Sequence, residues 1–265
     1  MEVGSLGLRT DLALLERAGS TIEDCGDHLV VRTPTNPTFY WGNFLVLDRV
    51  PGAAEDVAGW LDRFVVALPG ARHRAIAFDD PGGQVADLAA FAELGFTVDA
   101  WTVMTASSVR LPPRPNSAAT YRPFASDGDW AQSLTLQIAC HDGYEPDHLE
   151  FVTRRTESNQ ALVAQGHGQW FGAFLDSRLV TQMGLVAAGR RLARFQSVET
   201  HPEFRGRGLA GTLVHHVSGY GFAELGADAL VMVADPNYAA IRIYESVGFS
   251  ATESALQAEL FPASS

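Results

Sequence analysis

The residues of this chain best suited to chemistry lie in one glycine-rich turn. The turn reads Arg-Gly-Arg-Gly-Leu-Ala over 205–210, after Pro202 ends a short apolar strand and before a helical pattern that opens at Leu209. A strand, a glycine turn and a helix N-terminus together present unpaired backbone N–H groups. Glycine lets the backbone approach a ligand closely, and two guanidinium groups suit phosphate oxygens. The turn therefore predicts a cradle for a pyrophosphate group.

Two common phosphate-binding loops do not fit this turn. It is not a P-loop, because no Gly-Lys-Ser/Thr follows and the chain contains no lysine. It also lacks the third glycine of the dinucleotide-binding fingerprint. A Gly-Arg-Gly triplet is common in ordinary turns, so the function depends on what surrounds it.

A second motif gives the turn its context. Residues 205–210 resemble the Arg/Gln-x-x-Gly-x-Gly/Ala loop of the GCN5-related N-acetyltransferase (GNAT) superfamily, and 237–249 resemble that family's N-x-x-A-x-x-x-Y-x-x-x-G-F signature. Two signatures in the family's order are far more specific than one. The resemblance implies an α/β (α+β) GNAT fold with a mixed central sheet flanked by helices. It also implies acetyl-CoA as co-substrate and no metal.

The resemblance assigns cofactor contacts to a strand, the glycine turn and one asparagine. In the family the strand before the loop splays from its neighbour, so that its backbone pairs with the pantetheine arm, and the N–H of Val198 would donate to the thioester oxygen. Arg207 could instead be a solvated turn residue, and Asn237 a helix cap. The cofactor-binding residues expected in this way are Val198, Thr200, Arg205, Gly206, Arg207, Gly208, Leu209, Ala210, Gly211, Thr212 and Asn237.

Two catalytic residues are expected, with different support. Tyr244 follows Asn237 by seven residues, about two helical turns, so both would share a helix face. The resemblance implies that Tyr244 protonates the coenzyme A sulfur, for which a phenol of pKa ~10 is suited; the alternative is a packing residue. Glu199 and His201 share one side of a strand, and Glu199 is the candidate base, with a solvated strand residue as the alternative.

The acceptor is expected to contact the loop between the first two helices of the C-terminal half, through His141 and Tyr144. This expectation rests on position alone, because the loop varies with substrate in the family. The net charge of −12 repels nucleic acid and suits a cationic small-molecule amine. No membrane partner is expected, and a homodimer is allowed for.

The chain divides into two halves around the proline-rich segment 111–117, which reads as an interdomain linker of polyproline character. Residues 118–265 would form the catalytic GNAT domain and 1–112 a smaller, degenerate GNAT-like domain without a cofactor loop. An Asp-Pro pair and a later Gly-Phe pair recur in both halves, which predicts a tandem repeat. In the first half Phe91 stands where the second has Tyr244.

Local patterns predict most elements of both halves. Among them are a strand from Thr38 to Leu47, a last helix that opens at the Asp-Pro pair 235–236, and a closing strand over 254–260. Two cysteines, Cys25 and Cys140, predict buried reduced thiols and neither a disulfide nor a zinc site. Without an apolar span or a signal-like start, a cytoplasmic location is expected.

Three other functions remain open from the sequence. The enzyme could use another acyl donor or a peptide amine as acceptor. The chain could also be a non-catalytic acyl-CoA-binding sensor, which would not require the phenol of Tyr244. A Fem-like aminoacyl transferase also uses paired GNAT folds, but the acidic charge and the lack of basic clusters oppose tRNA binding.

Overall fold

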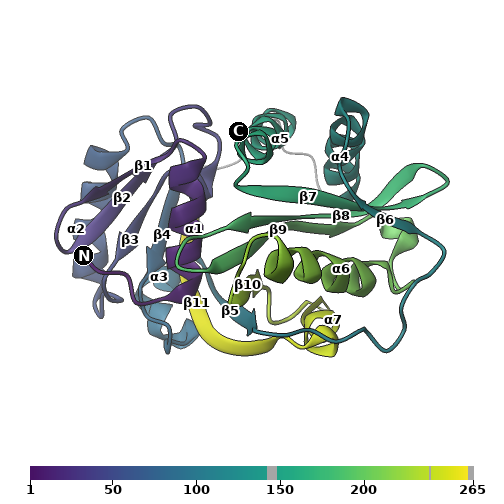
Figure 1. Ribbon diagram of the computed structural model, residues 1–265. Helices are drawn as coiled ribbons and strands as arrows, with labels where there is room; N and C mark the ends of the chain where they lie inside the picture. Colours follow the sequence, from purple (N-terminus) through teal and green to yellow (C-terminus); the bar gives the residue numbers. More distant parts are fainter. Residues whose placement is uncertain (142–147, 239, 262–265) are drawn as a thin grey trace. The chain divides into compact units, whose positions relative to one another are not determined.

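The computed structural model describes residues 1–141, 148–238 and 240–261. Contacts divide the chain into two units: unit 1 contains Met1–Val103, Val233–Pro236 and the segment from Thr252, and unit 2 contains Met104–Met232 and Asn237–Ala251. The elements (Figure 1) are α1 (Leu6–Arg17), β1 (Thr21–Asp24), β2 (His28–Arg32), η1 (Tyr40–Gly42), β3 (Phe44–Leu47), α2 (Ala54–Ala67), β4 (Arg74–Phe78), η2 (Val85–Leu88), α3 (Ala89–Glu93), β5 (Thr97–Ala106), β6 (Thr120–Pro123), α4 (Asp127–Cys140), α5 (His148–Ala164), β7 (Gly168–Leu175), β8 (Arg178–Ala187), β9 (Leu192–Thr200), η3 (Pro202–Phe204), α6 (Leu209–Ala223), β10 (Ala229–Ala234), α7 (Ala240–Val247) and β11 (Ser250–Leu260).

In unit 1 the strand order is β1-β2-β3-β4-β11, with β5 beside β11. Strands β3 and β4 are parallel, whereas β11 is antiparallel to β4, with Leu256 opposite Phe78. The predicted closing strand therefore exists, but it completes the sheet of unit 1. The contacts thus group the chain differently from the sequence division into 1–112 and 118–265, which stays a proposal.

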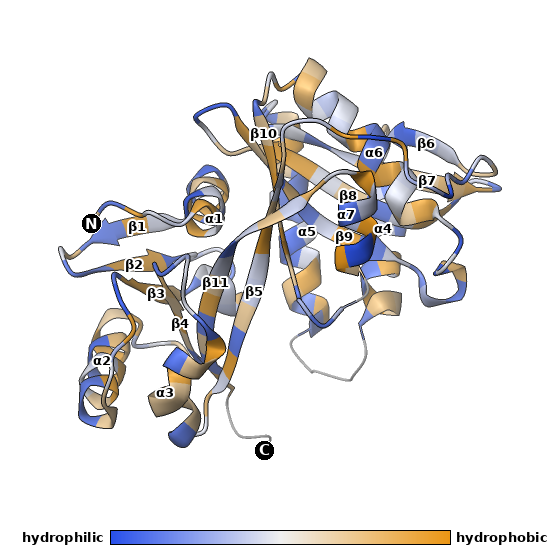
Figure 2. Cartoon of the chain, turned by 90° about the horizontal axis from the view of Figure 1, so that it is seen from below, coloured by the Kyte–Doolittle hydropathy of each residue, from blue (hydrophilic) through white to orange (hydrophobic). Residues whose placement is uncertain are grey.

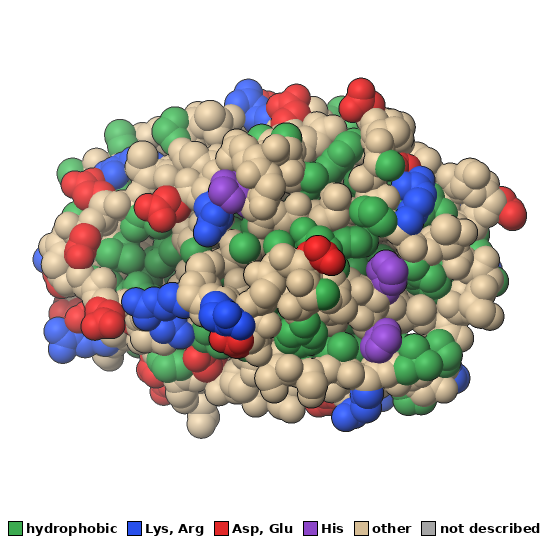
Figure 3. Space-filling model, in the orientation of Figure 1, with side chains coloured by type: hydrophobic (Ala, Val, Ile, Leu, Met, Phe, Trp, Pro, Cys, Tyr) green, Lys and Arg blue, Asp and Glu red, His purple; other side chains and the backbone are tan. Residues whose placement is uncertain are grey.

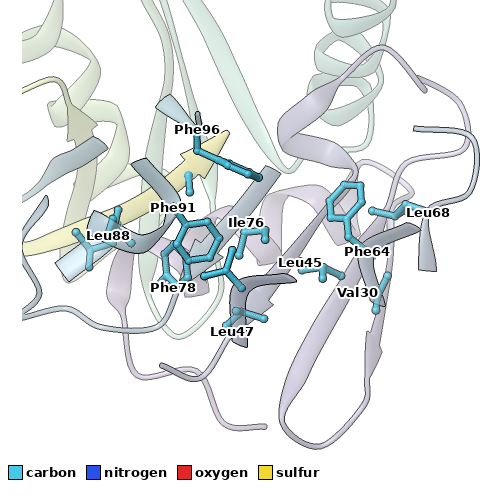
Figure 4. Packing of buried hydrophobic residues seen from close by; sticks show 13 residues of the cluster. Val30, Leu45, Leu47, Phe64, Leu68, Ile76, Phe78, Leu88, Phe91 and Phe96 are labelled. Carbon is cyan, nitrogen blue, oxygen red and sulfur yellow. The ribbon is translucent and has the colours of Figure 1, made fainter. Parts of the chain in front are cut away.

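The core of unit 1 is aromatic and aliphatic (Figure 4). Phe91 is fully buried, and its ring packs edge-on against Phe78 and Phe96, with ring centroids 5.2 and 5.4 Å away. Edge-to-face pairs of this kind add to the free energy gained by burial. The position that corresponds to Tyr244 in the first half is therefore a core residue.

Unit 2 is a sheet of order β10-β9-β8-β7-β6 between two helical layers. Strands β6 to β9 are antiparallel and β9 and β10 are parallel. Helices α4 and α5 cover one face and α6 the other (Figure 1). The helix predicted to open at Leu209 buries Leu209, Leu213, Val214 and Val217. At Gly221 an added Cβ would lie 2.7 Å from side-chain carbons of both Leu185 and Leu230, so glycine lets this helix approach the sheet closely.

Hydropathy follows this layering within each unit. Strands such as β3 and β4 are drawn mostly hydrophobic, whereas β1 is largely hydrophilic and α2 carries residues of both kinds (Figure 2). In α2 the buried residues are Val57 and Phe64, seven positions apart and so on one face. Burial of such a stripe, rather than helix propensity alone, supplies most of the stability of a helix of this length.

Two local expectations are wrong, and one strand was missed. Tyr40–Gly42 form a 3₁₀ turn instead of a strand, because the side chain of Asn43 organises the loop by accepting from Thr33 N and donating to Phe39 O. Strand β1 was not predicted. Helix α7 begins at Ala240, since 236–238 form a turn; proline suits the first helical turn and the second position of a β-turn alike, and here the β-turn forms.

Charge and thiol placement complete the description. Arginine and acidic side chains are interspersed over the face shown in Figure 3. Cys25 is exposed, contrary to the expectation of a buried thiol, and Cys140 is half-buried. In the part of the chain that the structure describes, no group of three or more His, Cys, Asp or Glu side chains could hold a metal ion. None of the described helices has the length and apolarity needed to span a bilayer.

Candidate functional site

Strand β9 carries a bulge just before the glycine turn. Between Gln196 and Glu199 it has two residues, Ser197 and Val198, where β8 has one. Ser197 has a left-handed φ of 48°, which is unusual for a residue with a side chain. A bulge disrupts the ladder locally and redirects backbone and side-chain groups. Val198, the predicted donor to a thioester oxygen, therefore lies where backbone groups leave the regular β8–β9 register.

The same strand also separates from its parallel neighbour. The β9–β10 register covers Leu192–Arg194 and extends no further among the described residues, although β9 continues to Thr200. A strand that loses its partner can pair with an extended ligand. This is the separation that the resemblance implies. The carbonyl of Thr200 is already used within the chain, since it accepts from Arg205 Nε at 3.2 Å and from Cys140 Sγ at 3.4 Å.

The glycine turn joins β9 to α6 as predicted. Gly206 and Gly208 have φ values of 75° and 76°, and Gly208 is the N-cap of α6, which begins at Leu209. Both arginines of the turn are exposed and also brace it: Arg207 donates to the carbonyl of Glu203 at 3.0 Å and stacks on a neighbouring phenylalanine ring. Cationic side chains beside the first N–H groups of a helix form a site suited to an anion.

The two glycines of the turn allow a matched comparison. An added Cβ at Gly206 meets nothing within 4 Å, whereas at Gly208 it would lie 2.4 Å from the carbonyl oxygen of Arg114. We expect Gly206→Ala to cost about 1–2 kcal/mol of unfolding free energy, the strain of a left-handed alanine. Gly208→Ala should cost clearly more, because a backbone carbonyl must also move. Urea unfolding of both variants measures the difference, and equal costs would contradict this geometry.

Tyr244 lies on α7 and is buried, with a relative exposure of 5%, its ring packed edge-on against Phe249. Burial raises the pKa of its phenol above the ordinary value, because the anion loses solvation, so the group stays protonated at neutral pH. Asn237 is exposed in the turn before α7. The argument that it shares a helix face with Tyr244 is therefore wrong, and its role as a cofactor ligand stays a prediction.

Glu199 is half-buried and lies opposite Gln182 of β8. The Nε2 of Gln182, which is fully buried, donates to the Glu199 carboxylate at 2.5 Å. Loss of solvation raises the pKa of Glu199 to about 7, and the hydrogen bond from Gln182 lowers it in part. A carboxyl group that titrates near neutral pH can both accept and release a proton.

The other candidate base, His201, lies just past the end of β9 and has different contacts. The Nδ1 of His201 accepts from the N–H of Glu203 at 3.3 Å and caps η3, and its Nε2 lies 3.0 Å from a guanidinium nitrogen of Arg178. Both ring nitrogens are thus engaged locally, which favours Glu199 as the base. Sequence reasoning missed Gln182; its signal is a polar amide inside the apolar run of β8, where buried polar groups are uncommon.

The expected acceptor residues are described only in part. His141, at the C-terminus of α4, stacks on His148 of α5 with ring centroids 3.6 Å apart. Tyr144 lies outside the described residues. Stacked imidazoles at the ends of two neighbouring helices fix the distance between those ends. The contact of His141 with an acceptor stays a prediction.

Comparison with known proteins agrees with the motifs and the fold. The family model described as FR47-like protein matches residues 180–257, the stretch from β8 into β11. A GCN5-related N-acetyltransferase from Kribbella flavida has a TM-score of 0.65 at 16% identity, over 96% of each chain. A tandem GNAT protein from the clavulanic acid biosynthesis pathway has a TM-score of 0.58 at 15% identity, over 100% of this chain and 90% of that one.

A protein of unknown function from Staphylococcus epidermidis has the same fold, with a TM-score of 0.72 at 13% identity over 91% of this chain and 94% of that one. A search of curated protein sequences found no match. At these identities the structural likeness establishes the fold, and the family match adds the sequence relationship of the segment that holds the bulge, the glycine turn and Tyr244. The family match thus covers residues 180–257, and over its length the chain has the fold of the GCN5-related N-acetyltransferases named above.

Proposed function

We propose that the protein is an acetyl-CoA-dependent N-acetyltransferase that acts on the primary amine of a small molecule. The observation that carries this proposal is the bulged end of β9, which has left β10 and leads directly into the glycine turn at the N-terminus of α6. The unpaired strand suits an extended pantetheine arm and the turn suits its diphosphate. The donor set therefore fits coenzyme A.

The chain also offers a residue for each step of acetyl transfer after the cofactor has bound. The N–H of Val198 would stabilise the thioester oxygen as the amine nitrogen bonds to the carbonyl carbon. Glu199 would accept the proton that the attacking amine must lose, and Tyr244 would donate its phenolic proton to sulfur as the carbon–sulfur bond breaks. Arg205, Arg207 and the first N–H groups of α6 would hold the diphosphate. No step requires a metal ion.

A tandem origin with a degenerate first copy is part of the proposal. Both halves contain a parallel strand pair joined by a helix, β3-α2-β4 and β9-α6-β10, followed by a short helix that ends at a glycine of positive φ, Gly95 or Gly248. In the first copy, Glu55 and Asp56 occupy the first turn of α2. Carboxylates there satisfy the helix dipole and repel phosphate, so this copy would not bind the cofactor.

Calorimetry with acetyl-CoA tests the proposed function. Wild-type protein should bind acetyl-CoA, and the double substitution Arg205→Glu with Arg207→Glu should weaken binding about 100-fold, because it replaces two attractive charges with two repulsive ones. Arg49→Glu, at a side chain 84% exposed in unit 1, is the matched charge control. Wild-type protein that gives no heat would refute the proposal.

A panel of acceptors then separates the remaining alternatives. Turnover of small cationic amines supports the proposed substrate class, and turnover of peptide amines alone would replace it with a peptide acetyltransferase. Acetyl-CoA binding without turnover of any acceptor would favour a sensor. A cytoplasmic location and a homodimer stay predictions.

A further inference from the structure

We propose that residues 108–119, here called the strap, position the two working ends of the coenzyme A site relative to each other: Arg110 anchors the helix that carries the proton donor, and Asn116 anchors the glycine turn. This inference rests on the proposed function. The proline-rich part of the strap is irregular, as the sequence predicts, but it is not a free linker. It lies within unit 2 and contacts both α6 and α7.

The first anchor holds the C-terminus of α7. The guanidinium of Arg110 donates from Nη2 to the carbonyl of Glu245 at 2.7 Å and from Nε to the carbonyl of Ser246 at 3.1 Å, and its backbone N–H donates to Val247 O at 2.8 Å. These carbonyls are among those that a helix end leaves without intrahelical partners, and a cation there also opposes the negative end of the dipole. Tyr244 immediately precedes this bonded group.

The second anchor holds the glycine turn. The Nδ2 of Asn116 donates to the carbonyl of Arg207 at 2.9 Å, and its backbone N–H donates to Thr212 Oγ1 at 2.9 Å. The Oδ1 of Asn116 accepts from the N–H groups of Ala118 and Ala119 at 3.0 and 3.1 Å. One side chain therefore fixes the local turn of the strap and, at the same time, the peptide between the two glycines of the loop.

The residues between the anchors make the strap stiff and closely fitted. Prolines at 112, 113 and 115 restrict the backbone and favour an extended, semi-rigid conformation. The carbonyl oxygen of Arg114 lies 2.4 Å from where a Cβ at Gly208 would be, and Pro112 lies 3.4 Å from the corresponding position at Gly211. A stiff segment bonded at both ends sets the separation between α7 and the loop. With coenzyme A bound, the strap would set the distance between Tyr244, which protonates the sulfur, and the glycine turn, which holds the diphosphate.

Steady-state kinetics of two single variants test the strap. Arg110→Ala should lower kcat about 10-fold and leave the Kd for acetyl-CoA within about twofold, because only the proton-donor helix loses its anchor and small misplacements are costly in catalysis. Asn116→Ala should raise the Kd for acetyl-CoA about 10-fold and leave kcat at saturation within about twofold. Arg110→Lys, which keeps the cation at the helix end, should recover part of kcat. A purely structural role would not produce this opposite split.

The controls keep the inference separable from the proposed function. Arg49→Ala removes an exposed arginine of unit 1 and should change neither parameter. If either alanine variant fails to fold, Arg110→Met, which keeps the side-chain stem but removes the donors, and Asn116→Ser provide the same comparison. Variants that bind and turn over like wild type, or that change both parameters in parallel, would overturn the strap alone. Wild-type protein that binds no acetyl-CoA would instead overturn the proposed function, and the role of the strap with it.

Discussion

Replacing Tyr244 with phenylalanine is expected to lower kcat about 100-fold, the scale of a lost general acid, while the Kd for acetyl-CoA stays within about twofold. The phenyl ring keeps its packing against Phe249, and burial has kept the wild-type phenol in its protonated form. The fold should therefore tolerate the change. Stopped-time assays at saturating acetyl-CoA give kcat, and calorimetry gives the Kd.

The same variant separates an enzyme from a sensor. A sensor needs the cofactor site but no proton donor, so Tyr244→Phe would leave all of its measurable properties unchanged. Tyr220→Phe is a matched control, since that phenol lies on α6 and packs against Phe171. An unchanged kcat in Tyr244→Phe would remove the tyrosine from the mechanism and leave Tyr244 as a packing residue.

Replacing Glu199 with glutamine is expected to lower kcat/KM about 100-fold at neutral pH and to abolish the acidic limb of the pH profile. In wild type the carboxyl group, with a pKa of about 7, must be ionised to accept a proton, so activity should rise with pH through about 7. The glutamine amide oxygen can still accept the hydrogen bond from Gln182, which limits structural change. His201→Asn should retain the acidic limb, because that ring is engaged with Arg178 and Glu203.

The pH dependence of the free energy of unfolding tests the raised pKa of Glu199 independently of activity. The folded-state pKa of Glu199, about 7, lies above the ordinary glutamate value of 4.5, so the native state holds the proton more tightly than the unfolded state. The contribution of this carboxyl group to the free energy of unfolding is therefore fully present below pH 4.5 and is lost as pH rises to about 7. Glu199→Gln should leave stability unchanged near pH 4 and raise it at pH 8 by up to about 3 kcal/mol. Equal unfolding curves at both pH values would show a solvated carboxylate instead.

The glycine turn could be predicted because its information is local. Three local features specify the turn and the first residue of α6 without long-range contacts. They are two glycines at the required spacing, a proline that ends the strand, and an apolar stripe that starts at Leu209. The family signature that contains Tyr244 is likewise contiguous. The buried stripe of α6 follows from the helical period alone.

The start of α7 and the strand predicted over 38–47 show where local reasoning fails. Proline after aspartate fits a helix start and a β-turn equally well, so only the surrounding structure decides between them. The loop before β3 is set by Asn43, whose side chain accepts from the N–H of Thr33 and donates to the carbonyl of Asn36. The pattern of hydrophobic residues does not predict these hydrogen bonds of a single polar side chain.

By itself, then, the sequence determined the glycine turn as a candidate anion site, the helix that follows it, and the phenol of Tyr244 as a candidate proton donor. Tertiary structure alone decided that Glu199 faces Gln182, that the chain's last strand joins the sheet of unit 1, and that Arg110 and Asn116 bond to the end of α7 and to the glycine turn. The physical reason is the same in each case. A motif is written in neighbouring residues, whereas a pKa near 7 or an anchored helix end depends on groups that only folding brings together.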